Sequence, residues 1–464
     1  MTTATITRTE RITATMAGWA ASLRFADLST DAAYQAKRFL LDSLGCALGG
    51  FRQHDVRIAL AVLDETAGPG PATVIGTGKR IDVVSAALAN ALMVRVMDYN
   101  DIYWKQDPCH PSDIIPAALA CCERKASGGE ELIVGIIIGH EFEQRLCEAA
   151  FPGIRERGWH HATLTAFASP IVAGRCLHLS AEQIQHAIGI SASRHCTLGA
   201  VTAGKLTMMK NTVDPMATQS GVLAALLAEG GYTGPEHVID GKEGLAHCFG
   251  PEWKLDILTQ GLGESWRITQ CGMKAFPTEA LTHAPISAAL EIVKTNDLKP
   301  EQVAEVHIRS LHRAVDILAD PSKYDPRSKE TADHSLPYVI AAAIVDRNVT
   351  PAQFVAAKIA DPVIREQLHK VKVVADPEIE KLFPALQRVI VKITTRDGRS
   401  FEKQLDYPKG DPRNPLTDKE IEEKFEALAE GVISKEQQRR LEEGVWNLER
   451  LASVSELMAL LQAQ

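Results

Sequence analysis

The sequence predicts a mainly α protein, with a large all-α helical domain and a smaller α+β lid domain. Apolar residues recur at helical spacing almost throughout residues 12–262, two-residue alternation is confined to residues 303–408, and helical spacing returns after residue 416. A chain of 464 residues also exceeds the size at which one hydrophobic core keeps growing. We therefore expect the helical domain to comprise residues 1–265 and 410–464, and the lid residues 266–409.

The first half of the chain is a series of predicted helices. Residues 30–50, TDAAYQAKRFLLDSLGCALGG, begin with Thr and Asp and stop at Gly-Gly, as helices commonly do. Residues 80–98, 129–150 and 215–234 show similar spacing, are apolar on more than one face and are rich in Ala and Gly. Such helices pack closely inside a large helical domain.

The lid is predicted from three alternating segments. These are VAEVHIRSL (303–311), HKVKVVAD (369–376) and RVIVKITTRDGRSFEKQLDYP (388–408), the last with a hairpin turn at Asp397-Gly398. Helix-like segments separate them. The three amphipathic helices that follow would form a poor core alone, so we expect them to rejoin the first domain.

Bulk properties limit the function classes. The formal net charge is −9 and the pI about 6.0, which argues against a nucleic-acid partner, because phosphate binding needs clustered Lys and Arg. The N-terminus lacks a signal-peptide pattern and no apolar run could span a bilayer. Nine cysteines form no CxxC pair, which is typical of reduced thiols. We expect a soluble cytoplasmic protein with no membrane partner.

Common cofactor motifs are absent. The chain has no GxGxxG after a strand, no GxxxxGK[ST], no HExxH and no GxSxG. His140 has no second histidine at helical spacing, so we interpret it as a buried structural residue rather than half of a metal site. We therefore predict acid/base chemistry with no cofactor and no metal.

The stretch MDYNDIYWKQDPCHPSD, residues 97–113, interrupts two apolar helical segments with reactive side chains. Ser112 or Asp113 can cap the next helix, but a cap explains neither Asp98 and Asp101 nor His110. We therefore predict that these three contribute to a site.

Adjacent His160 and His161, in RGWHHATLT, open the next apolar helix. A helix N-terminus lowers the pKa of a nearby histidine, so a neutral imidazole base could lie here. Two loop histidines at a surface turn are the alternative.

Lysines stand at two unusual places. Lys210 directly precedes an almost wholly apolar helix, closer than Lys205, and a buried ammonium group needs an anion. Lys274 and Glu279 lie in QCGMKAFPTEALTH, near the change of domain, where ligand clefts tend to form.

His334 and Tyr338 are four residues apart in TADHSLPYVIAAA and share one face if the helix starts that early. For Tyr338 the alternative is a core aromatic residue with a satisfied hydroxyl.

Taken in order, these segments resemble the MmgE/PrpD family, which includes 2-methylcitrate dehydratase and cis-aconitate decarboxylase. The matching motifs are MDYNDIYW, HPSD, GWHHAT, KAFPTEA, ADHSLPY and YPKGDPRNP, and the resemblance runs from about residue 10 to about residue 450. It implies a helical domain built from both chain ends, an inserted α+β lid and a homodimer.

Carried over by position, the resemblance implies a catalytic set, to which the residue patterns add substrate-binding candidates. The catalytic set is Asp98, His110, His161, Lys210, Lys274 and Tyr338; the substrate-binding candidates are Asp101, His160, Glu279 and His334. His161 is favoured because HAT resembles the family's His-x-Thr pattern, although the register could shift to His160. Ile102 stands where many members have threonine. Glu279 stands where the decarboxylase branch has histidine, which favours dehydration.

The resulting hypothesis is a cofactor-independent lyase that dehydrates 2-methylcitrate or a related hydroxy-polycarboxylate. His110 or His161 would act as base and the other as acid, Asp98 would orient a histidine, and the two lysines would hold carboxylates. The alternatives are an isomerase, epimerase or decarboxylase for a similar acid, such as cis-aconitate or iminodisuccinate, and a non-catalytic helical binding protein.

Overall fold

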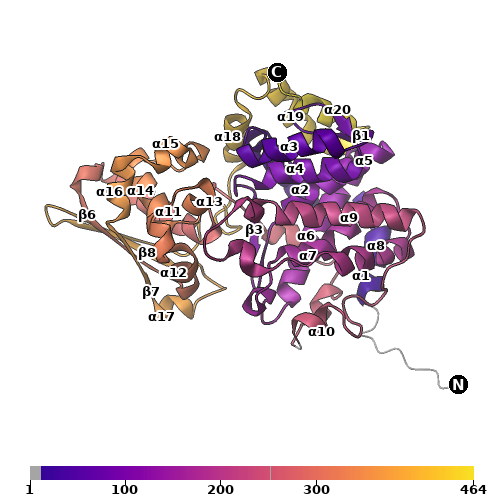
Figure 1. The fold of residues 1–464 in the computed structure, drawn as a ribbon, viewed down its shortest axis with the longest axis horizontal. Helices are drawn as coiled ribbons and strands as arrows, with labels where there is room; N and C mark the ends of the chain where they lie inside the picture. Colours follow the sequence, from indigo (N-terminus) through magenta and orange to yellow (C-terminus); the bar gives the residue numbers. More distant parts are fainter. Residues whose placement is uncertain (1–11, 251) are drawn as a thin grey trace.

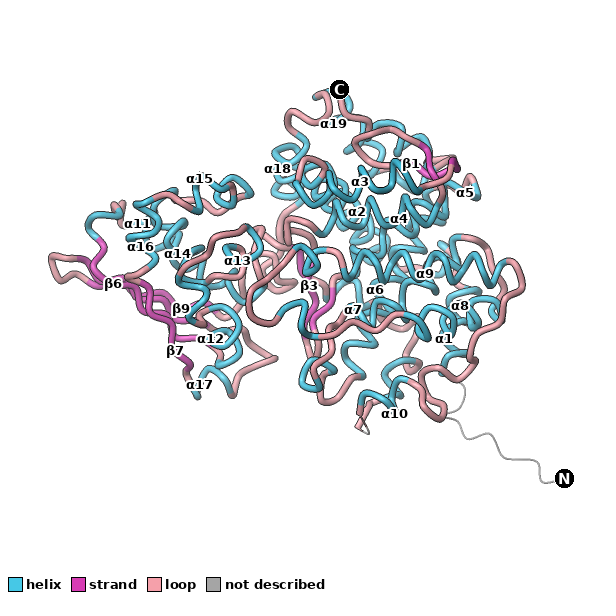
Figure 2. Tube along the Cα trace, viewed as in Figure 1, coloured by secondary structure: helices cyan, strands magenta, loops and turns pink. Residues whose placement is uncertain are grey.

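The computed structural model describes residues 12–250 and 252–464 (Figure 1). Residues 1–11 lie outside the described residues. The prediction that the N-terminus lacks a signal-peptide pattern concerns this stretch in part. The expected fold class is confirmed: a large helical part stands beside a smaller α+β part, and Figure 2 shows the longest strands gathered in the smaller part.

Most of the larger part consists of helices that pack around one another. They are α1 (Ile12–Ser22), α2 (Thr30–Gly50), α3 (His54–Thr66), α4 (Val83–Arg95), α5 (Ile115–Lys125), α6 (Gly129–Ala149), α7 (Ala162–Cys176), α8 (Ala181–Arg194), α9 (Val213–Glu229) and α10 (Leu245–Phe249), with α18 (Asp418–Ala429), α19 (Lys435–Trp446) and α20 (Val454–Met458) from the C-terminal segment.

The C-terminal helices pack against the N-terminal ones. A Cβ at Gly45 of α2 would lie 3.1 Å from the backbone of Phe425 in α18, so a small residue permits this close helix contact. Phe425 is fully buried in the same hydrophobic cluster as α2. Both chain ends therefore contribute to one core.

The smaller part contains a four-stranded mixed sheet. Its strands are β6 (Val303–Ser310), β7 (Val371–Ala375), β8 (Val389–Thr395) and β9 (Ser400–Leu405), in the order β7-β6-β8-β9, with β6 and β7 parallel. β8 and β9 form the predicted hairpin, and Gly398 has a φ of 86° that favours glycine in its turn. The accompanying helices are α11 (His283–Thr295), α12 (His312–Leu318), α13 (Lys329–Ala332), α14 (Leu336–Asp346), α15 (Ala356–Ile359), α16 (Pro362–Leu368) and α17 (Pro377–Glu380).

Short strands interrupt the first half of the chain, where the sequence predicted helix almost throughout. β1 (Pro69–Thr73) pairs with β2 (Arg80–Ile81), and β3 (Asp101–Trp104) lies between β4 (Pro108–Cys109) and β5 (Gly272–Met273). The Ile-Tyr-Trp run of β3 favours extended backbone. The pairing of β3 with β5 joins segments distant in sequence, which local periodicity does not reveal.

Two hydrophobic clusters divide the described chain. The smaller includes buried residues from Ala280 to Ile393 together with Trp104, whereas Trp266 and Met273 belong to the larger. The smaller core thus begins after β5 rather than at residue 266. Trp104 of β3 brings the two cores together, so this strand lies at their junction.

Candidate active site

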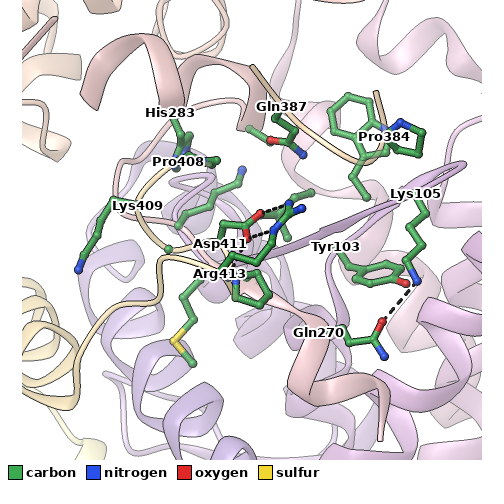
Figure 3. Close-up of a pocket in the computed structure, with 18 of the residues that line it drawn as sticks. Tyr103, Lys105, Gln270, His283, Pro384, Gln387, Pro408, Lys409, Asp411 and Arg413 are labelled. Carbon is green, nitrogen blue, oxygen red and sulfur yellow. Dashed lines mark hydrogen bonds and ion pairs between the residues drawn. The ribbon is translucent and has the colours of Figure 1, made fainter. Parts of the chain in front are cut away.

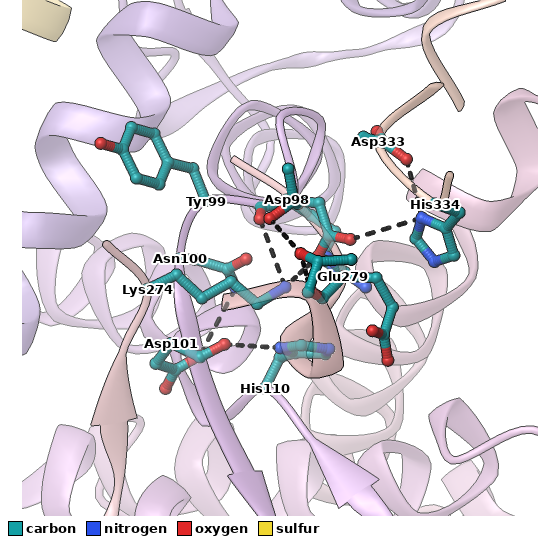
Figure 4. Close-up of polar contacts among 12 residues, drawn as sticks. Asp98, Tyr99, Asn100, Asp101, His110, Lys274, Glu279, Asp333 and His334 are labelled. Atoms are coloured by element: carbon teal, nitrogen blue, oxygen red, sulfur yellow. Dashed lines mark hydrogen bonds and ion pairs between the residues drawn. The ribbon is translucent and has the colours of Figure 1, made fainter. Parts of the chain in front are cut away.

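A small cavity of about 50 Å³ lies where the two parts meet. Its lining brings together most of the predicted site residues, from segments far apart in the sequence (Figure 4). They are Asp98, His110, His160, His161, Lys210, Lys274, Glu279 and His334.

Asp98 is the charged centre of this group. It follows α4 in a left-handed conformation, with a φ of 51°, which aspartate tolerates better than most residues. Its carboxylate pairs with Lys274 Nζ at 2.5 Å, with Lys210 Nζ at 3.3 Å and with Arg95. Burial would raise the pKa of Asp98, but both lysines and Arg95 outweigh it and hold that pKa well below its usual range. Asp98 is therefore an anion.

The two lysines arrive from different segments. Lys210 lies on a 3-10 helix (Met208–Asn211) before α9, and Lys274 follows β5. Lys210 also donates to Asp333 Oδ1 at 3.1 Å, and Lys274 donates to the Asp98 carbonyl at 3.2 Å. An ammonium group has three N–H donors, so each lysine retains a donor for a substrate oxygen.

His110 is held as a neutral imidazole in one tautomer. Its Nδ1 lies 2.6 Å from the carbonyl oxygen of Asp101, which can only accept, so Nδ1 carries the proton and Nε2 keeps a lone pair. Burial, with Arg95 and Lys274 adding to it, lowers the pKa of His110 well below its usual value. His110 is suited to act as a base.

The adjacent histidines differ in their partners. His161 Nε2 lies 3.5 Å from Asp214 Oδ2, and the His110 and His161 ring centroids are 5.4 Å apart. Burial would raise the pKa of Asp214, but His161, His160 and Arg95 hold it below its usual range. His160 Nδ1 accepts from the Ala162 N–H at 3.2 Å, so a neutral His160 offers an N–H at Nε2.

Glu279 supplies an acid. Its side chain accepts the Leu281 N–H at 2.7 Å at the start of a 3-10 helix (Ala280–Thr282). Burial, opposed by Lys274, raises the pKa of Glu279 to about 7. A substantial fraction of Glu279 is therefore protonated near neutral pH.

His334 and Asp333 form the lid side of the site. His334 Nδ1 lies 2.7 Å from Asp333 Oδ1, which leaves Nε2 unprotonated when the ring is neutral. Burial and then Lys210 lower the pKa of His334 to about 4.

Tyr338 does not line the cavity. It is fully buried in the core of the smaller part, where its hydroxyl donates to the Gln353 carbonyl at 2.5 Å. The helix α14 begins at Leu336, so His334 precedes it and the expected shared face does not form. Tyr338 is thus the satisfied core aromatic residue given as the alternative.

Two other expectations on acidic residues are corrected. Asp101 does not line the cavity, and its carboxylate accepts a hydrogen bond from the Ser112 N–H at 2.9 Å. Only its backbone carbonyl contacts a site residue, as the acceptor for His110 Nδ1. Asp98 pairs with the cations, and the histidine near its carboxylate is His334, whose Nδ1 lies 4.0 Å from Oδ2, rather than His110 or His161; Asp214 takes the position beside His161.

Several residues that contribute to the site were not predicted from the sequence. They are Arg95, Arg155, Asp214 and Asp333. Arg95 and Asp214 could have been recognised, because each is a charged residue in or at the end of an apolar segment. Both are buried in the structure. Arg155 and Asp333 lie in polar surroundings in the sequence, where nothing distinguishes them from surface residues.

Lys424 of α18 connects the C-terminal segment to the site. Its Nζ donates to the carbonyls of Tyr99 at 2.6 Å and Lys274 at 3.0 Å, and pairs with Asp42 at 2.6 Å. The Tyr99 carbonyl directly follows Asp98 in the chain. Lys424 therefore fixes the backbone on both sides of the Asp98–Lys274 ion pair.

Three groups of described residues combine potential metal ligands: Asp98, Asp333 and His334; His160, His161 and Asp214; and Asp101, His140 and Cys271. In the first group, the Lys210 ammonium already lies 3.1 Å from Asp333 and 3.3 Å from Asp98, in the place a cation would take. The third group is buried away from the cavity lining, with His140 Nε2 3.4 Å from Asp101 Oδ2.

A larger cavity of about 490 Å³ shares part of its lining with the first (Figure 3). Its basic side chains are paired: Arg413 with Asp411 at 2.8 Å and Lys105 with Glu148 at 3.0 Å. The reactive groups described above, apart from Lys274, do not line it. The smaller cavity is therefore the candidate active site.

Models of two protein-family domains match this chain. The model of the MmgE/PrpD N-terminal domain matches residues 14–258, and that of the MmgE/PrpD C-terminal domain matches residues 276–450. The chain belongs to the MmgE/PrpD family. None of its described helices has the length and apolar character needed to cross a membrane.

Family relatives carry two kinds of activity in their names. "Cis-aconitate decarboxylase-like protein oryM" of Aspergillus oryzae is 28% identical, with 98% of each chain covered. Human "Cis-aconitate decarboxylase" is 27% identical over 95% of this chain and 92% of its own. "2-methylcitrate dehydratase" of Cupriavidus necator is 25% identical over 82% of this chain and 81% of its own. The relatives are thus named as enzymes, with decarboxylases matching over more of the chain.

Proposed function

We propose that this MmgE/PrpD protein is a lyase that dehydrates 2-methylcitrate or a related hydroxy-tricarboxylate. The observation that carries this proposal is a neutral base, His110, and a protonated acid, Glu279, lining one cavity with two lysines. Dehydration needs all three functions: removal of a C–H proton, stabilisation of the resulting charge and protonation of the departing hydroxyl.

The roles follow from the protonation states. His110 Nε2 takes the proton from the carbon next to a carboxylate. Lys210 and Lys274 each offer an N–H to the oxygens on which negative charge accumulates. Glu279 gives its proton to the departing hydroxyl, which leaves as water while the carbon-carbon double bond forms. Asp214 orients His161, the second candidate base.

A second candidate function is decarboxylation of cis-aconitate. It is supported by the relatives named as cis-aconitate decarboxylases, which match over 95–98% of this chain. In this reaction a carbon-carbon bond breaks, carbon dioxide leaves, the double bond shifts and a proton is added to carbon. Glu279 would then deliver its proton to carbon instead of oxygen. The carboxylic acid at position 279 favours the first candidate.

One screen separates these candidates. Purified protein is incubated with 2-methylcitrate, citrate, cis-aconitate and iminodisuccinate, and the unsaturated acid is followed by ultraviolet absorbance and carbon dioxide by its release. We expect absorbance to rise with 2-methylcitrate and no carbon dioxide to form. Isomerisation of iminodisuccinate would identify the epimerase alternative. Neither turnover nor thermal stabilisation by any of these acids would support a non-catalytic binding protein.

A further inference from the structure

The candidate active-site cavity is too small for a whole tricarboxylate. Its volume is about 50 Å³, below the roughly 300–1,000 Å³ of typical small-molecule sites. A second, outer cavity of about 550 Å³ shares its lining residues Arg155, His160 and His161. The 490 Å³ cavity shares only Lys274 of the reactive groups, so the outer cavity is the space that continues from the reactive histidines and into which a bound substrate extends.

Arg155 lies where the two cavities meet. It belongs to a 3-10 helix (Ile154–Arg157) whose first N–H groups are fixed by Asp107: the carboxylate accepts Ile154 N at 2.7 Å and Arg155 N at 3.3 Å. Gly153 permits this contact, because a Cβ there would lie 2.7 Å from an Asp107 oxygen. The backbone of Arg155 is thus held in place by a buried carboxylate.

The guanidinium group of Arg155, in contrast, lacks a protein partner among the residues that the structure describes. Within residues 12–250 and 252–464, no ion pair or side-chain hydrogen bond engages it, whereas Lys210 and Lys274 both pair with Asp98. Burial lowers the pKa of Arg155, while Glu279 opposes the shift. Glu279 also spends much of its time protonated near neutral pH, so it neutralises Arg155 only in part.

An unpaired, partly desolvated arginine at the mouth of an anion-binding cavity is suited to a planar carboxylate, which it can bind through two parallel N–H donors. We propose that Arg155 anchors one carboxylate of the substrate at this junction, beyond the carboxylates that Lys210 and Lys274 hold. The inference rests on the proposed function for the reacting end of the molecule, and it makes the substrate a tricarboxylate that spans both cavities.

Binding of an unreactive probe tests this without turnover. Propane-1,2,3-tricarboxylate has neither a hydroxyl group nor a double bond, and its Kd can be measured by calorimetry. We expect Arg155→Met to weaken its binding roughly 10- to 100-fold, as for a lost hydrogen bond between charged groups. Arg155→Lys should restore part of the affinity, since it keeps the charge but not the two-pronged geometry.

Arg157→Met is the matched control, because it removes the same charge from an exposed arginine two residues away. Circular dichroism and thermal unfolding check that each variant is folded. Equal Kd values for wild type, Arg155→Met and Arg157→Met would overturn the role of Arg155 and leave the proposed function standing. Loss of binding in Arg155→Met without turnover of any acid by wild type would refute the proposed function alone. No binding of the probe by wild type that still dehydrates 2-methylcitrate would overturn the role of Arg155 alone, and no binding together with no turnover would overturn both.

Discussion

Replacing Glu279 with glutamine removes the proposed acid while preserving size and shape. The glutamine oxygen can still accept the Leu281 N–H, which Glu279 Oε2 accepts at 2.7 Å, so the start of the following 3-10 helix is retained. Because a positioned general acid typically contributes about 10²–10⁴-fold, we expect kcat for dehydration to fall by that order. KM should change less, since protonation of the departing hydroxyl occurs in the transition state.

The pH dependence follows from the raised pKa of Glu279, about 7. Only the protonated form can donate, so wild-type kcat should decline as pH rises through about 7. Glutamine does not titrate, and the variant should lack this limb of the profile.

Stability gives an independent measure of the same group. Its pKa is about 7 in the folded protein and 4.5 as a model value, a difference equivalent to about 3 kcal/mol. The folded state binds the proton more tightly than the unfolded state, so this contribution is complete below pH 4.5 and is lost as pH rises through about 7. The stability of Glu279→Gln relative to wild type should therefore increase by about 3 kcal/mol between pH 4.5 and 8.5.

Stopped assays of 2-methylcitrate dehydration from pH 5.5 to 9 and urea unfolding at pH 4.5 and 8.5 test both expectations. Glu301→Gln, at an exposed position in the lid, serves as the control. A variant that keeps wild-type kcat, or that loses kcat but retains the decline near pH 7, would refute the assignment of Glu279 as the acid.

Three further predictions concern the rest of the site. Lys210→Ala and Lys274→Ala should each lower kcat/KM, which corresponds to a loss of about 2–5 kcal/mol of transition-state stabilisation. The fold should be retained, because Asp98 keeps two cations in each variant. Unchanged kcat/KM with an intact circular dichroism spectrum would exclude that lysine from the site. Lys424→Met should lower kcat and Tm together, since it frees the Tyr99 and Lys274 carbonyls; a lowered Tm with unchanged kcat would limit Lys424 to stability. Activity should survive a strong chelator and exposure to air, as expected from the absence of cofactor motifs in the sequence; activity lost and then restored by iron would contradict this.

Local patterns predicted the lid well, whereas long-range contacts did not follow from them. The hairpin of β8 and β9 could be predicted because its strands alternate and its Asp397-Gly398 turn lies between them. The pairing of β3 with β5 depends on two residues, Gly272 and Met273, too few to show a period. The strand at the junction of the two cores, β3, was therefore not predicted from the sequence.

For the site, residue type was predictable but pairing was not. Four histidines, three acids, two lysines and a tyrosine were predicted to form one site, and eight of these ten residues line the cavity. That Asp214 rather than Asp98 lies beside His161 depends on how α9 packs against α7, which no single segment contains. Tyr338 shows the complementary error: its spacing from His334 suggested one helical face, but α14 begins only at Leu336 and Tyr338 lies in the core of the smaller part.

The product of the reaction tests the central claim most directly. Wild-type protein is given 2-methylcitrate and, separately, cis-aconitate, and both the unsaturated acid and released carbon dioxide are measured. The account predicts formation of the unsaturated tricarboxylate and water from 2-methylcitrate, with no carbon dioxide from cis-aconitate. Release of carbon dioxide from cis-aconitate, without dehydration of 2-methylcitrate, would contradict it.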